Sequence, residues 1–190
     1  MFLLNFRLCY LQLEDIRNKM KDKLKKTLTS LWTGELVATA MFWLNYGLLM
    51  WGDTTRGGGS IFGTNAYLAL TYSLAMLSLI LVQGSAYWLI LIKRIKVPEF
   101  GAGTVGKIYR VCRIVDMVLI ALGVPVIVFC HSSVFATVLS SGLILFALVE
   151  WVNYYTWRLS YSYNPAVLIG LIRRGKLKRS KIALEIAELG

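Results

Sequence analysis

The basic residues of this chain are confined to three segments that alternate with long apolar runs. Twenty of its 21 Lys and Arg residues lie within residues 1–30, 93–113 and 158–190, and the exception is Arg56. An apolar run of about 20 residues can cross the hydrocarbon layer of a membrane as one helix. Basic segments resist translocation, so segments separated by an even number of crossings stay together in the cytoplasm. The pattern predicts a membrane protein with cytoplasmic N and C termini.

Four apolar runs are long enough to cross, at about residues 31–51, 67–92, 111–130 and 134–157. Trp32 and Trp51 bracket the first run, which is typical of aromatic anchors at the membrane interfaces. The predicted fold is an all-α, polytopic bundle of four transmembrane helices over residues 31–157. Residues 1–30 are expected to form a basic amphipathic helix, and residues 158–190 basic cytoplasmic helices.

Composition favours a membrane partner over a nucleic acid. The chain is 57% apolar with a mean hydropathy of +0.61, above the usual range of soluble domains. Its net charge of +11 would also suit a nucleic-acid-binding protein. Cytoplasmic flanks of membrane spans produce the same excess, so we expect no nucleic acid. The expected partner of these flanks is the anionic headgroups of the cytoplasmic leaflet, at about 1 kcal/mol per basic residue near the surface.

Cofactor and catalytic motifs are missing from the sequence. Cys9, Cys112 and Cys130 lie far apart without a CxxC pair, so neither a disulfide framework nor a zinc site is expected. There is one histidine, His131, and no GxSxG or HExxH motif. Arg7 interrupts the apolar N terminus and no cleavage site follows, which argues against a cleavable signal peptide. We therefore expect no cofactor, no metal and no catalytic site.

The two terminal segments each carry an apolar stripe. The N-terminal stripe consists of Leu13, Ile16, Met20, Leu24 and Leu31. It predicts a helix that lies in the inner membrane interface, or one that binds a partner or packs on itself.

At the C-terminal end, Asn164-Pro165 is a helix start and Gly175 a helix stop. A closing helix follows, with Ile182, Ile186 and Leu189 at i, i+4 and i+7. That stripe needs a partner, for which lipid, the N-terminal helix, a second subunit and a different protein are the candidates.

Polar residues within the predicted spans form a candidate intramembrane polar cluster. Its members are Glu35, Arg113, Asp116, Glu150 and Asn153. At ~1.5 Å per residue the three carboxylates lie about 22–26 Å from the outer edge of the apolar layer. The cluster could hold a cation, pass a proton or bind a lipid headgroup. We favour an ion-pair lock, in which Arg110 and Arg113 neutralise Asp116 and Glu150, because charges within membranes usually pair.

A candidate partner- or lipid-binding surface follows the fourth span. Its aromatic and basic residues are Tyr154, Trp157, Arg158, Tyr161, Arg173, Arg174, Lys176, Lys178, Arg179 and Lys181. The alternative is an aromatic belt at the inner interface. A stripe of small and hydroxyl residues on the second span, Thr71, Ser78, Gly84 and Ser85, predicts close helix packing rather than a pore lining. We expect the chain to self-associate through this stripe.

Two functional hypotheses follow. The first is a non-enzymatic, multi-pass subunit of the plasma or inner membrane, self-associating, that anchors or regulates a cytoplasmic partner. The second is an oligomeric ion or proton channel, or a transporter subunit, that uses Glu35, Asp116 and Glu150. An enzyme acting on lipid headgroups is a weaker alternative, because the chain lacks a nucleophile with its base.

Overall fold

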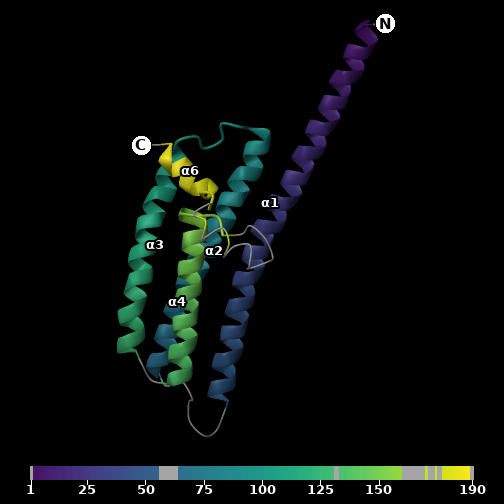
Figure 1. Cartoon of the computed structure of the whole chain (residues 1–190). Helices are drawn as coiled ribbons and strands as arrows, with labels where there is room; N and C mark the ends of the chain where they lie inside the picture. Colours follow the sequence, from purple (N-terminus) through teal and green to yellow (C-terminus); the bar gives the residue numbers. More distant parts are fainter. Residues whose placement is uncertain are drawn as a thin grey trace.

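The computed structural model describes residues 2–55, 64–130, 133–159, 170, 174 and 177–188, without the side chains of residues 2–13 and 64. This part of the chain is all-helical. Its five helices are α1 (Phe2–Thr54), α2 (Thr64–Lys96), α3 (Thr104–Phe129), α4 (Val134–Tyr155) and α6 (Lys181–Ala187). Figure 1 shows the four long helices side by side, with α6 across one end of them. We call that end of the bundle the α6 end.

Three of the described helices are long and apolar enough to cross a membrane. They are α2, α3 and α4, over Asn65–Lys96, Thr104–Phe129 and Val134–Tyr155. The chain is accordingly a membrane protein. The predicted first span, residues 31–51, belongs to α1, which is not among these three helices. Glu35 and Asn45 lower the hydropathy of that half of α1, so a fourth crossing stays a prediction.

Helix α2 is central to the packing. It contacts α1, α3 and α4, and α3 also contacts α4. The apolar core lies along these contacts, where Leu77 and Ile80 of α2 and Ala147 of α4 are fully buried. The helices therefore pack around α2, and the residues on its faces position the polar groups described below.

Helix α1 runs from residue 2 to residue 54 without a break at the boundary predicted near residue 30. No Gly or Pro occurs before Gly34, so the sequence offers no interruption of the helix. All side chains from residue 14 to 27 are exposed, and Leu28 is the first buried one. We call residues 2–27 the arm; its N-terminal part projects beyond the α6 end (Figure 1), while Leu24 and Thr27 near its base line a groove at that end. The predicted N-terminal helix is thus an extension of α1.

The connection between α2 and α3 is shorter than predicted. The predicted spans at about residues 67–92 and 111–130 leave 18 residues between them, whereas the structure has non-helical backbone only from 97 to 103. Pro98 begins the break. Gly101 and Gly103 then adopt φ values of 69° and 75°, which residues with a Cβ rarely adopt. The backbone is helical up to residue 96 and again from residue 104. Arg94 therefore belongs to α2, and Lys107 belongs to α3.

The chain folds back after α4 ends. Arg158 N donates to Lys178 O (3.1 Å), and Ser180 N donates to Thr156 O (3.2 Å), in a short antiparallel bridge. The Ser180 hydroxyl then caps α6 by accepting from Ala183 N (3.0 Å).

Two members of the predicted C-terminal stripe, Ile182 and Ile186, are 3% and 7% exposed and belong to the main core cluster. Their partner is the bundle of the same chain, through α3 and α4, rather than any of the four predicted partners. Leu189 and the helix predicted over residues 165–175 lie outside the described residues, apart from isolated positions.

Candidate functional site

The polar cluster predicted from the sequence is divided between two groups of hydrogen bonds near the α6 end. In the first group, Glu35 Oε1 of α1 accepts from Trp88 Nε1 of α2 (2.7 Å) and from the Tyr154 hydroxyl of α4 (2.5 Å). Gly84 makes room for this arrangement, because a Cβ there would lie 2.5 Å from Tyr154 Cζ. Glu35 therefore connects three helices.

The second group surrounds Asp116 of α3, which is fully buried. Its Oδ1 accepts from Gln83 Nε2 (3.0 Å), and Gln83 Oε1 accepts from the Tyr155 hydroxyl (2.8 Å). The Tyr109 hydroxyl donates to the backbone carbonyl of Gln83 (2.7 Å). A buried carboxylate is costly without hydrogen bonds, and here the neutral Gln83 amide provides one to Oδ1. Adjacent tyrosines of α4 thus reach different carboxylates, Tyr154 to Glu35 and Tyr155 toward Asp116.

The predicted ion-pair lock is wrong for the described residues. The Arg113 side chain is exposed, and only its backbone carbonyl is engaged, by Trp151 Nε1 (3.1 Å). The Arg110 guanidinium donates to the Ile186 carbonyl (3.2 Å). Within the described chain, no ion pair joins either arginine to a carboxylate. Both arginines are exposed on α3 and Arg110 is engaged by α6, while Asp116 is buried in the core, so neither arginine pairs with it.

Glu150 and Asn153 form a local contact at the end of α4. Asn153 Nδ2 donates to Glu150 Oε2 (3.3 Å), and Asn153 Oδ1 accepts from Leu159 N (2.9 Å). Asn153 therefore stabilises the chain reversal after α4. Across the described residues, no three His, Cys, Asp or Glu side chains are arranged to hold a metal ion.

The predicted binding surface is partly buried. Tyr154 is 5% exposed and is a core residue rather than a surface residue. The exposed basic members are Arg158, Arg174, Lys178, Arg179 and Lys181. Trp157 beside them is also exposed. Tyr161, Arg173 and Lys176 lie outside the described residues. What remains is a basic patch around the chain reversal and the start of α6.

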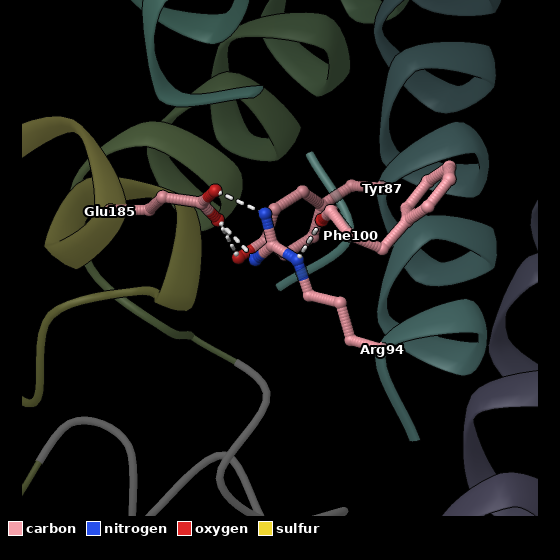
Figure 2. Close-up of polar contacts among 4 residues, drawn as sticks. All are labelled: Tyr87, Arg94, Phe100 and Glu185. Atoms are coloured by element: carbon pink, nitrogen blue, oxygen red, sulfur yellow. Dashed lines mark hydrogen bonds and ion pairs between the residues drawn. The ribbon is translucent and has the colours of Figure 1, made fainter. Parts of the chain in front are cut away.

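Sequence analysis missed the group of residues that fastens α6, which we call the latch: Tyr87, Arg94, Phe100 and Glu185. Figure 2 shows the Arg94 guanidinium facing the Glu185 carboxylate, with Nη2–Oε1 and Nη1–Oε2 distances of 2.6 and 3.0 Å. The Tyr87 hydroxyl also donates to Glu185 (3.0 Å), and Arg94 Nε donates to the Phe100 carbonyl (2.9 Å). The available signal was the presence of two acidic residues, Glu185 and Glu188, beside Ile186 in a segment that has seven basic ones.

The stripe on α2 faces α1 of the same chain. The Thr71 hydroxyl bonds the Tyr46 hydroxyl (2.5 Å), and Ser78 Oγ accepts from Trp43 Nε1 (2.9 Å). The third hydroxyl of the stripe, Ser85 Oγ, donates to the Trp32 carbonyl (3.1 Å). Gly84 faces Tyr154 of α4. The stripe is occupied within the chain, so the predicted self-association through it is not retained.

Comparison of the chain with protein-family models, with curated proteins and with solved structures found no match. Any functional inference for this membrane protein therefore depends on its own geometry.

Proposed function

We propose that this chain is a non-enzymatic, multi-pass membrane subunit whose arm anchors or regulates a cytoplasmic protein. In this proposal residues 31–51 of α1 form a fourth span and the α6 end faces the cytoplasm. The arm and the basic patch then lie on the same, cytoplasmic side of the membrane. This arrangement agrees with the tendency of basic segments to stay in the cytoplasm. The hydrogen bonds from the α2 stripe to α1 support a fourth span, because they satisfy polar groups between the two helices.

The observation that carries the proposal is the exposed apolar stripe of the arm. Ile16, Met20 and Leu24 are 53%, 67% and 44% exposed on one helical face. Basic residues flank this face, among them Arg17 and Lys21. A helix with apolar residues at i, i+4 and i+8 is suited to the hydrophobic groove of another protein.

The direction of the arm favours a protein over the membrane surface. A helix that binds lipid headgroups lies in the plane of the interface. The arm instead continues α1 and points away from the bundle (Figure 1). The basic flanks then indicate a partner with an acidic rim around an apolar groove.

Site-specific photo-crosslinking in native membranes tests this proposal. A photoreactive residue at position 20 is expected to capture one soluble protein, which also co-purifies with the wild-type chain. The same residue at position 18, exposed on the opposite face of the arm, is the matched control and should not capture it. The Met20→Asp variant should lose the co-purifying protein while it still inserts into the membrane. Capture of lipid alone at position 20, or a monomeric chain that retains no partner, would contradict the proposal.

An ion or proton pathway is the second candidate. The observation in its favour is that Glu35 Oε2 and Asp116 Oδ2 are buried and have no hydrogen-bond partner among the described residues. A pathway needs its carboxylates along one route, whereas these two belong to separate groups of hydrogen bonds. Flux measurements on reconstituted liposomes decide the matter, with Asp116→Asn and Glu150→Gln as test variants. Flux that both substitutions abolish would favour the pathway over the subunit.

A further inference from the structure

A groove at the α6 end has the composition of a lipid-headgroup site. It lies between α1, α2, the end of α4 and the start of α6, with a volume of about 180 Å³. Leu28, Leu31 and Ile182 form an apolar wall, and Asn153, Arg158 and Lys181 stand at the polar rim. Four segments distant in the sequence therefore build one concave surface whose lining includes both apolar and cationic residues.

The two cations of the rim are available to a ligand. Arg158 and Lys181 are both exposed, and neither takes part in an ion pair within the described residues. Among the carboxylates next to the groove, Glu150 accepts a hydrogen bond from Asn153 Nδ2 (3.3 Å), and Glu35 lies behind the aromatic floor. Trp88 and Tyr154, which line that floor, both donate hydrogen bonds to Glu35. An anion is therefore attracted to the rim rather than to the floor.

The size and place of the groove select the kind of ligand. Pockets for whole small molecules usually measure about 300–1,000 Å³, so this groove admits only part of an amphiphile. It lies where the membrane-length helices α2 and α4 approach their ends, at the level of Trp88 and Tyr154. Aromatic residues at that level are typical of the membrane interface, where phosphate groups of lipids are found.

We propose that the groove binds the headgroup of an anionic phospholipid. The phosphate lies between Arg158 and Lys181, which supply charge-assisted hydrogen bonds, and arginine is well suited to grip two phosphate oxygens at once. The first part of the acyl chains contacts Leu28 and Leu31. The groove shares one lining residue, Leu24, with the stripe proposed to bind a protein, while Ile16 and Met20 lie outside the groove.

Native mass spectrometry of the full chain in a non-ionic detergent tests the proposal, with phosphatidylglycerol and phosphatidylcholine as probes. The wild-type chain is expected to retain one phosphatidylglycerol in preference to phosphatidylcholine. The double variant Arg158→Gln/Lys181→Gln should bind phosphatidylglycerol about tenfold more weakly. The matched control Arg17→Gln/Lys21→Gln removes the same charge from the arm and should change binding by less than about twofold.

A second variant separates shape from charge. Thr27→Trp places a large side chain at the groove from an exposed position and leaves every charge in place. It should also weaken phosphatidylglycerol binding while circular dichroism stays unchanged. Binding unaffected by both groove variants, or equal losses in the arm control, would overturn the proposal. Equal retention of phosphatidylcholine, or full displacement by soluble glycerol phosphate, would also overturn it, since either result removes the need for an anionic lipid.

Discussion

The arm and α6 are two terminal helical segments with similar apolar patterns and opposite fates. Ile16 of the arm is 53% exposed, whereas Ile182 of α6 is 3% exposed. The difference arises from the residues around each stripe. A chain reversal and the Ser180 cap direct α6 back onto the bundle, and Glu185 then meets Arg94. The arm continues α1 with no such turn. An amphipathic pattern thus shows that a helix needs a partner, while turns and complementary charges decide whether the chain itself provides one.

The largest expected effect comes from truncation of the buried stripe. Ile182→Ala should destabilise the docked state of α6 by about 2–5 kcal/mol, because it leaves a cavity in the core cluster. Ile16→Ala, at the equivalent kind of position in the arm, should change stability by less than about 0.5 kcal/mol. Hydrogen–deuterium exchange over residues 181–187 measures the first effect. Equal losses of stability from Ile182→Ala and Ile16→Ala would contradict the claim that α6 is docked and the arm is not.

Loss of the latch should have the next largest effect. Glu185→Gln removes the charged acceptor of Arg94 and Tyr87, at a cost of about 1.5–3 kcal/mol to α6 docking. The matched control is Asp15→Asn, which breaks the exposed Lys19–Asp15 pair of the arm (2.8 Å). It should cost less than about 0.5 kcal/mol. Limited proteolysis of the segment that follows residue 177 measures how much each variant loosens the docking of α6. Cleavage of the Glu185→Gln chain at the wild-type rate would contradict a stabilising role of the latch.

A smaller effect is expected where the bundle supports the chain reversal. Gly84→Ala forces Tyr154 away from its place against α2, at a cost of about 1–3 kcal/mol. Because the Tyr154 carbonyl accepts a hydrogen bond from Ser180 Oγ, the start of α6 should loosen as well. Gly47→Ala is the control, since a Cβ there meets nothing within 4 Å. Thermal unfolding in detergent measures both, and a stable Gly84→Ala chain would show that Tyr154 has room to move.

The smallest effect on stability should come from the arm itself. Met20→Asp should leave the thermal unfolding of the bundle within about 0.5 kcal/mol of wild type, because the Met20 side chain is 67% exposed. Together with loss of the captured partner, this result would separate binding from folding. A large loss of stability would place the arm against the bundle and weaken its assignment as a docking helix.

Hydropathy predicted α2, α3 and α4, because a long apolar run identifies a membrane-length helix without any information about its neighbours. The first predicted span is not among these three helices, because Glu35 and Asn45 lower the hydropathy of that half of α1. Tyr46 and Trp43 face hydroxyls of α2, and that pairing is visible only in the fold. The depth of Glu35 was predicted, but its donors Trp88 and Tyr154 were not. Sequence spacing along one helix does not tell which face meets which neighbour.

The ion pairs show the same limit. Arginines three and six residues before Asp116 were the obvious partners, yet the observed pair joins Arg94 to Glu185, 91 residues away. The sequence has many basic residues and few acidic ones, so each acid has several possible partners. Only the chain reversal after α4 determines which of them Glu185 meets.

Cysteine accessibility tests the central claim most directly. Ile16→Cys and Ile182→Cys chains, with the native cysteines replaced by serine, are treated with a membrane-impermeant maleimide. We predict rapid labelling of residue 16 in inverted vesicles, none in intact cells, and labelling of residue 182 only after denaturation. Equal rates at the two positions would contradict a free arm beside a docked α6, and labelling of residue 16 in intact cells would contradict the cytoplasmic location of the arm.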